Sequence, residues 1–99
     1  MERIVCSAIY YNNKIVYNHQ PNNIHHGYVI CGYRHGDCFE ILKMIEKDLK
    51  HINLNKITQG FLTSTNRFVD RKEAFVIAKE SGQIQVIQEH GSLISEDLY

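Results

Sequence analysis

Residues 34–40 read Arg-His-Gly-Asp-Cys-Phe-Glu and residues 67–73 read Arg-Phe-Val-Asp-Arg-Lys-Glu, so the pattern R-x-x-D-x-x-E occurs twice in this chain of 99 residues. An extended apolar run lies shortly before each arginine, and a helical pattern begins just after each aspartate. The spacing D-x-x-E is an Asp-led variant of the helix capping box, in which the aspartate accepts a hydrogen bond from the third helical residue. The repeat therefore predicts two strand-to-helix junctions, each with an arginine beside the helix N-terminus.

Arg34 and Arg67 have two possible roles at these junctions. A helix N-terminus carries unpaired N–H groups and partial positive charge, so an adjacent arginine can complete an anion site. Alternatively, each arginine pairs only with the aspartate that caps its own helix. One copy alone would favour that simple pairing, whereas two copies at the same kind of junction favour phosphate binding.

The apolar residues elsewhere alternate between strand spacing and helix spacing. Strands are expected over residues 3–11, 14–17, 27–33, 57–63, 67–69 and 83–88. The first two form a hairpin through a turn at residues 12–13, and a polar loop follows at residues 18–26. Helices are expected over residues 37–49 and from Asp70 to a stop at Gly82. This order predicts an α+β fold, in which two helices pack on a mostly antiparallel β-sheet, as a single domain spanning the chain.

Eleven basic and eleven acidic residues give a formal net charge of zero. That balance argues against binding to duplex nucleic acid or to an anionic membrane surface, because both favour a basic surplus. No apolar run is long enough to span a membrane, and the first residues resemble a strand and not a signal peptide. Three cysteines without C-x-x-C spacing are expected to be reduced thiols. A chain this short buries a small core, so association into a homo-oligomer is expected.

Three other chemistries fit the residues poorly. The triplet RHG at residues 34–36 also occurs in histidine phosphatases, but those enzymes are much larger and use further arginines and histidines as a phosphate clamp. Five possible metal ligands lie within fourteen residues, namely His25, His26, Cys31, His35 and Cys38. They lack the short, regular spacings of structural zinc sites. A Cys38–His35 nucleophile would need an orienting group and an oxyanion site, and helical spacing already explains Cys38 as a core residue. No metal site and no cofactor are therefore expected.

The second copy of the repeat and the strand before it offer the most complete set of ligand-binding groups. Phe61 and Phe68 could stack on a nucleobase, and Thr63 adds a hydroxyl group. Arg67 and Arg71 could hold phosphates. The alternative is that both phenylalanines belong to the core and that the polar residues between them form only a turn. Composition and spacing leave these two interpretations open.

Four blocks of sequence resemble a widespread group of small bacteriophage proteins. They are residues 33–38 (YRHGDC), 59–63 (QGFLT), 67–74 (RFVDRKEA) and 95–99 (SEDLY). Together they are similar to the first-described type of Thoeris anti-defense sponge. That resemblance implies a non-enzymatic, oligomeric protein of the host cytoplasm, which tightly binds a cyclic ADP-ribose signal and keeps it from a host effector. In some relatives of this group, cyclic oligonucleotides are also held at a separate site.

The resemblance also assigns ligand-binding residues by matching positions. They are Arg34, His35, Arg67, Asp70 and Arg71, with Phe61 and Phe68 as the aromatic residues that would stack on adenine. Tyr33 stands where many relatives have a second basic residue. Two other classes of function stay open: a protein-binding inhibitor or adaptor of a host enzyme, and a small enzyme that uses His35 or Cys38 on a nucleotide.

Overall fold

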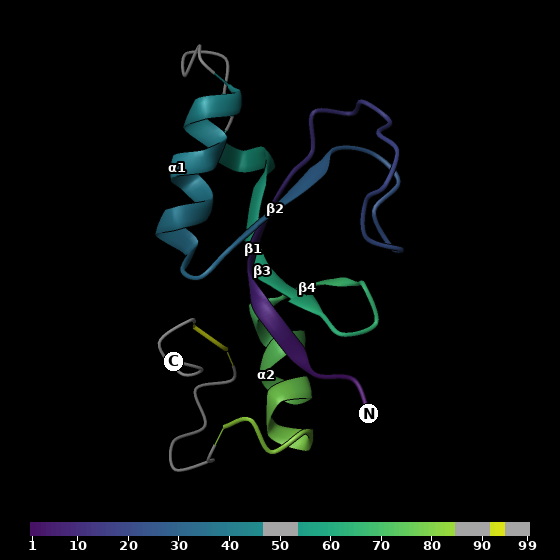
Figure 1. Cartoon of the computed structure of the whole chain (residues 1–99), viewed down its shortest axis with the longest axis vertical. Coiled ribbons are helices and arrows are strands. Elements are labelled where there is room, and N and C mark those ends of the chain that lie inside the picture. The colour runs from purple at the N-terminus through teal and green to yellow at the C-terminus, as the bar shows by residue number, and fades with distance from the viewer. Residues whose placement is uncertain (47–53, 85–91, 95–99) are drawn as a thin grey trace.

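The computed structural model describes residues 1–46, 54–84 and 92–94, and these form an α+β fold (Figure 1). In chain order the elements are β1 (Ile4–Tyr11), β2 (Tyr28–Gly32), α1 (His35–Ile45), a 3-10 turn η2 (Leu54–Lys56), β3 (Ile57–Thr63), β4 (Phe68–Asp70) and α2 (Arg71–Glu80). The sheet has the strand order β2-β1-β3-β4, and every neighbouring pair is antiparallel. The predicted fold class is confirmed.

Both helices cover the same face of this sheet. Ile9 of β1 packs in a buried cluster with Leu42 of α1. Phe61 of β3 packs in a second cluster with Ala74 of α2. Ser7 pairs with Phe61, and Ser7 and Ile9 point to the same side because side chains alternate along a strand. The two helices therefore divide one face of the sheet between them, and Figure 1 shows them over opposite ends of it.

The connection between β1 and β2 corrects one prediction. The expected hairpin strand over residues 14–17 is wrong, because residues 12–27 contain no strand. The side chains of Asn12 and Asn13 accept hydrogen bonds from the backbone N–H groups of Lys14 and Ile15, at 3.0 and 3.1 Å. Such local bonds close the backbone into turns of their own and compete with a strand ladder. Strand β1 instead pairs directly with the later strands β2 and β3.

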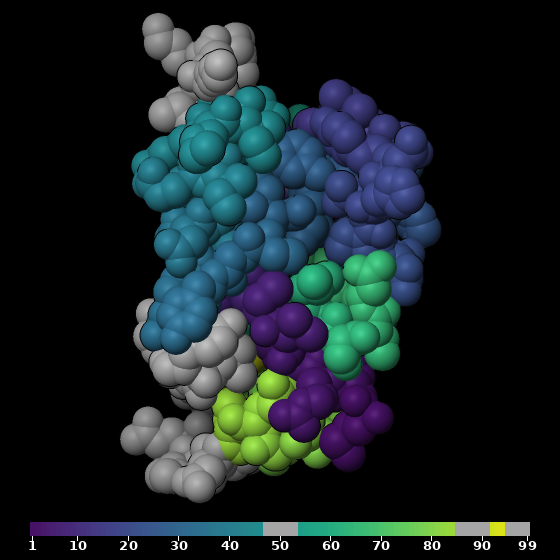
Figure 2. Space-filling view, in the orientation of Figure 1, coloured from purple at the N-terminus to yellow at the C-terminus, as the bar shows by residue number. Residues whose placement is uncertain are grey.

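The same connection covers the outer edge of β4. The Asn23 side chain donates to the carbonyl oxygen of Phe68 at 2.7 Å and accepts from the Phe68 N–H at 2.9 Å. Asn22 adds a backbone bond to Asn66 at 2.7 Å, and Figure 2 shows residues 12–27 lying directly beside the β3–β4 turn. An uncovered edge strand exposes unpaired backbone groups, so Asn23 takes the place that a fifth strand would have.

The remaining strands agree closely with expectation where they are described. The strand predicted over residues 57–63 is confirmed as β3, and β4 lies one residue later than the predicted 67–69. Strand β2 lies within the predicted 27–33. In the predicted strand 83–88, residues 83–84 lie outside any strand, and the rest lies outside the described residues.

Candidate functional site

The N-terminus of α2 is built as the repeat predicts. Asp70 is the N-cap residue, and its Oδ1 accepts a hydrogen bond from the backbone N–H of Glu73 at 2.8 Å. At the other end, α2 stops at Glu80, and Gly82 follows with a φ of 75°. A positive φ suits glycine at a helix C-terminus. Both predicted ends of this helix are confirmed.

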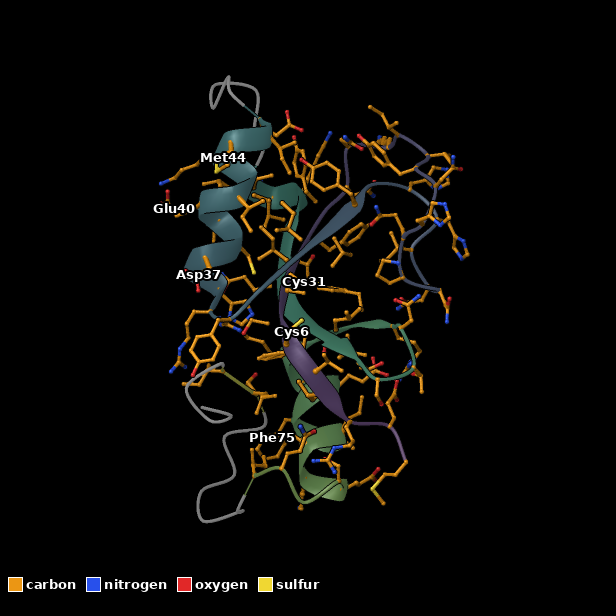
Figure 3. The ribbon with its side chains drawn as sticks, viewed as in Figure 1. Cys6, Cys31, Asp37, Glu40, Met44 and Phe75 are labelled. Atoms are coloured by element: carbon orange, nitrogen blue, oxygen red, sulfur yellow. The ribbon has the colours of Figure 1, made fainter. Side chains whose placement is uncertain are left out.

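The N-terminus of α1 is built differently, and the prediction that Asp37 caps it is wrong. The N-cap residue is Arg34, in extended conformation, and His35 is the first residue of the helix. Asp37 lies at the third helical position, where its Oδ2 accepts from the backbone N–H of Arg34 at 3.0 Å. Glu40 does not reach back to the helix start. It pairs with Lys43 at 3.0 Å on the outer side of α1, where Figure 3 shows it between Asp37 and Met44.

Both helices nevertheless begin beside the same residue, Gly60 in β3. The Nε2 atom of His35 lies 2.8 Å from the carbonyl oxygen of Gly60. Because a carbonyl oxygen can only accept, Nε2 carries the proton in this contact. Asp70 pairs with Gly60 across the β3–β4 ladder. From this point α1 and α2 run in opposite directions (Figure 1), so two positively polarised helix ends meet at the middle of the sheet.

Gly60 has no space for a larger side chain. A Cβ atom there would overlap the carbonyl oxygen of Val69 and would lie 2.8 Å from the Phe68 ring. Sequence reasoning did not single out Gly60, although a glycine inside a strand pattern can mark a close approach of another backbone. That signal would have found it.

The side chain of His35 is held in place by Gly60 and by the neighbouring Phe61 of β3. Its side chain is buried, with 8 % of its surface exposed, and its ring stacks on Phe61 with centroids 5.1 Å apart. The ring is thus held between the sheet and the first turn of α1. His35 fixes the place where the helix starts, which explains why α1 begins two residues earlier than the sequence predicts.

Arg71 is the first residue of α2, and it directly follows Asp70, the residue that pairs with Gly60. Its Nη2 donates to Gln59 Oε1 at 2.6 Å. Its Nε is buried and has no hydrogen-bond partner among the residues that the structure describes. The backbone of residue 71 also accepts from Leu93 at 2.8 Å, so the segment 92–94 lies beside this helix start. Arg71 therefore has a buried N–H group whose hydrogen-bonding capacity is not used by the described residues.

Arg67 is held by carboxylates instead. It donates to both oxygens of Glu2, from Nε at 2.9 Å and from Nη2 at 2.8 Å, and it lies 3.3 Å from Glu73. Glu2 also accepts from the hydroxyl groups of Thr63 and Thr65. These hydrogen bonds, Arg67 foremost, lower the pKa of Glu2 to about 2. The simple pairing expected as an alternative thus describes Arg67, although its partners are Glu2 and Glu73 and not Asp70.

The two phenylalanines of the predicted site lie in the interior. Phe61 is fully buried, and Phe68 is 7 % exposed and packs on Tyr10 with ring centroids 5.8 Å apart. The aromatic ring with open surface beside a junction is Tyr33, which is 59 % exposed. The Arg34 guanidinium lies 5.2 Å from the centroid of that ring. The sequence marks Tyr33 as a departure from the family pattern and as one of several tyrosines that could add stacking surface, and the structure shows that its ring is open to solvent.

An open recess of about 490 Å³ lies under the connection between β1 and β2, away from the helix starts. It is lined by Tyr10, Asn12, Lys14, Asn23, His25 and His26, none of which belongs to the predicted site. Within the described parts of the chain, no three His, Cys, Asp or Glu residues come together in a way that could hold a metal ion. Among the same residues, no helix is long and apolar enough to cross a membrane.

The structure is therefore a small α+β fold in which both helices begin beside Gly60, α1 after Arg34 and α2 with Arg71. The sequence profile of the phage T4 y16D protein family matches residues 3–99, so the chain belongs to this family of small phage proteins. No curated protein and no solved structure matches the chain.

Proposed function

We propose that this protein binds and sequesters a cyclic ADP-ribose-type nucleotide signal and thereby blocks Thoeris-type immunity of the host. The phage family and the resemblance of the sequence blocks to anti-defense sponges support this proposal. The observation that carries it is the meeting of two helix N-termini at Gly60, since such ends bind phosphate through free N–H groups and a favourable dipole.

The charged groups at the meeting point suit a diphosphate. Arg71 begins α2 and offers its buried Nε–H, and Arg34 caps α1. A guanidinium group pairs with phosphate through parallel hydrogen bonds, which are roughly twice as strong as those between neutral groups. Two phosphates joined in one ligand could be shared between the two helix starts. Arg67 contributes indirectly in this proposal, because its bonds to Glu2 fix the turn before α2.

The nucleobase needs a flat partner with open surface. Tyr33 offers one directly before Arg34, whereas Phe61 and Phe68 could take this role only after leaving the core. A stacked base contributes about 1–3 kcal/mol in nucleotide-binding proteins. We therefore add Tyr33 to the predicted ligand-binding residues.

Binding without turnover is the proposed activity. Burial raises the pKa of the Cys38 thiol to about 11, so this side chain is not a thiolate near neutral pH. His35 uses its Nε2 proton in the contact with Gly60. A sponge works by affinity and by copy number, so it needs neither a nucleophile nor a general base.

Calorimetric titration with the isomers of cyclic ADP-ribose tests this function. The unmodified protein should bind one isomer, and Arg71→Ala should weaken that binding by at least about tenfold, or 1.4 kcal/mol. Lys72→Ala is the matched control, because Lys72 is the next residue of the same helix, carries the same charge and is exposed. Its affinity should stay close to that of the unmodified protein. Absence of binding heat with every isomer, or an equal loss in both variants, would contradict the proposal.

Native mass spectrometry of the protein purified from cells that make the signal gives a second measurement. A sponge should retain an intact nucleotide, and the spectrum should also report the number of copies in the expected homo-oligomer. Recovery of a cleaved nucleotide would instead favour a small enzyme.

A protein-binding inhibitor of a host enzyme is the second candidate function. The observation that favours it is the apolar outer side of α1, where Ile41, Met44 and Ile45 are 37 %, 73 % and 52 % exposed. Large exposed apolar side chains grouped on one helix are typical of a contact surface. In a pull-down from host lysate, this candidate predicts a host protein at a stoichiometric amount and no retained nucleotide. The sponge predicts the reverse.

A further inference from the structure

Two cysteines lie side by side on the face of the sheet that the helices do not cover. In the β1–β2 ladder Cys31 is paired with Ala8, and Cys6 is two residues before Ala8 on the same face. Cys6 and Cys31 are therefore diagonal neighbours on adjacent strands, as Figure 3 also shows. Because α1 and α2 pack on the opposite face, neither of these two helices covers the pair.

The two thiols are accessible and in contact with each other. Cys31 is exposed and Cys6 is partly exposed, whereas Cys38 is buried. A hydrogen bond from the Cys31 thiol lowers the pKa of Cys6 to about 7, against partial burial, which raises it. The same hydrogen bond and burial raise the pKa of Cys31 above its ordinary value. One thiolate and one thiol are thus held together near neutral pH, which is the arrangement of an attacking and a resolving cysteine.

The backbone around Cys6 can accommodate a change at the sulfur. The β1–β3 register shifts between Ile4 and Cys6, so strand β1 has a bulge at Val5. A bulge leaves one residue outside the ladder and bends its strand. Diagonal positions lie farther apart than directly opposite ones, so a bond between the two sulfurs requires a small movement of the strands. Bonds formed in this way are easily reduced again.

We propose that Cys6 and Cys31 form a reversible redox pair, in which Cys6 attacks a low-molecular-weight disulfide such as oxidised glutathione and Cys31 resolves the product. In the first step the Cys6 thiolate bonds to one sulfur of the small disulfide, whose S–S bond breaks and releases one thiolate. In the second step Cys31 loses its proton to water and attacks the Cys6 sulfur, which releases the other small thiolate. Two electrons pass from the protein thiols to the small disulfide, which leaves as two reduced thiols.

Intact-protein mass spectrometry after incubation with oxidised glutathione tests the pair. The unmodified protein should lose the mass of two hydrogen atoms, and a reductant should restore it. Cys31→Ser should stop at the first step and gain one glutathionyl group, located on Cys6 by peptide mapping. Cys6→Ser should show neither change, and Cys38→Ala is the control that should react as the unmodified protein does.

Three results would overturn the proposal. They are a protein that keeps three free thiols under these conditions, a Cys6→Ser variant that oxidises at the unmodified rate, and a glutathionyl group found on Cys38 in Cys31→Ser. Circular dichroism of each reduced variant checks that the fold is kept. If Cys6→Ser does not fold, Cys6→Ala replaces it with the same expected outcome.

Discussion

Residues 34–40 and residues 67–73 carry the same three charged side chains at the same spacing, but they make different contacts. In the second copy Asp70 caps α2, and Glu73 lies 3.3 Å from Arg67. In the first copy the aspartate is the third residue of the helix, within its first turn, and Glu40 pairs with a lysine of α1. The pattern therefore defines where a strand passes into a helix, and it does not by itself define which residue caps the helix.

The difference comes from residues outside the repeat. Glu2, which also accepts from Thr63, holds Arg67 at the second junction, and the contact of His35 with Gly60 sets the start of α1 at the first. Each of these contacts joins residues that lie far apart in the chain. Gly60 contacts both junctions, so a substitution at Gly60 should destabilise both copies of the repeat. A substitution at Glu2, Asp37 or Asp70 should destabilise only the junction to which that residue belongs.

Gly60→Ala is expected to have the largest effect. The added Cβ would overlap the backbone oxygen of Val69, and a backbone atom cannot move aside as a flexible side chain can. Overpacking of this kind costs about 3 kcal/mol or more, because the β3–β4 ladder must shift. Urea denaturation should show that loss in the free energy of unfolding. A loss below about 1 kcal/mol would mean that the two helix starts do not depend on this close approach.

Gly36→Ala is the matched control for this change. Gly36 lies in the first turn of α1, and a Cβ there meets nothing within 4 Å. Alanine loses less conformational entropy in a helix, so this variant should be more stable by about 0.5–1 kcal/mol. The same substitution should therefore have opposite signs at two positions 24 residues apart.

Glu2→Gln should weaken the second junction only. The pKa of Glu2 lies at about 2, below its ordinary value of 4.5, because Arg67 and the two threonines favour the carboxylate. The pair is partly open to solvent, with 37 % of the Arg67 side chain and 21 % of the Glu2 side chain exposed. Water and salt reduce its contribution, so we expect a loss of about 1.5 kcal/mol at pH 6.

The pH dependence of that loss gives the sharper measurement. A lowered pKa means that the carboxylate stabilises the fold above about pH 4.5 and that this contribution disappears as the pH falls toward 2. Urea midpoints of the unmodified protein and of Glu2→Gln should therefore differ at pH 6 and converge near pH 2. A constant difference between the two across this range would show that Glu2 acts through packing and not through its charge. Glu40→Gln in the first copy should have a small effect at all of these pH values, because its ion pair with Lys43 is exposed.

Local patterns predicted much of the fold correctly. Alternating and 3.6-residue spacings located β3 and α2 closely, because each has a buried face and a clear turn signal. The hairpin at residues 12–17 was predicted wrongly, because an Asn-Asn pair fits a two-residue turn as well as it fits the side-chain turns that actually form. Strand order was also beyond local reasoning, since β1 takes both its partners from distant parts of the chain.

The candidate site was predictable only in part. Charge and spacing indicated Asp70 and the arginines, because caps and junctions are local features. The partner of Arg67 could not be predicted, since no pattern links Glu2 to a residue 65 positions later. Gly60 could have been found from the sequence, because it is a glycine inside a strand pattern. The exposure of the Tyr33 ring could not, because it depends on how the chain folds. Whether these residues bind a nucleotide stays a prediction.

The smallest expected effect separates the two aspartates. Asp70→Ala removes an N-cap hydrogen bond of 2.8 Å and should cost about 1 kcal/mol. Asp37→Ala removes a third-position carboxylate that accepts from the Arg34 N–H, and it should cost about 0.5 kcal/mol. Asparagine also caps well, so Asp70→Asn should recover most of the loss. Urea denaturation of the four proteins at one pH measures these differences. Equal costs at both positions, or no recovery with asparagine, would mean that the two copies of the repeat are capped alike after all.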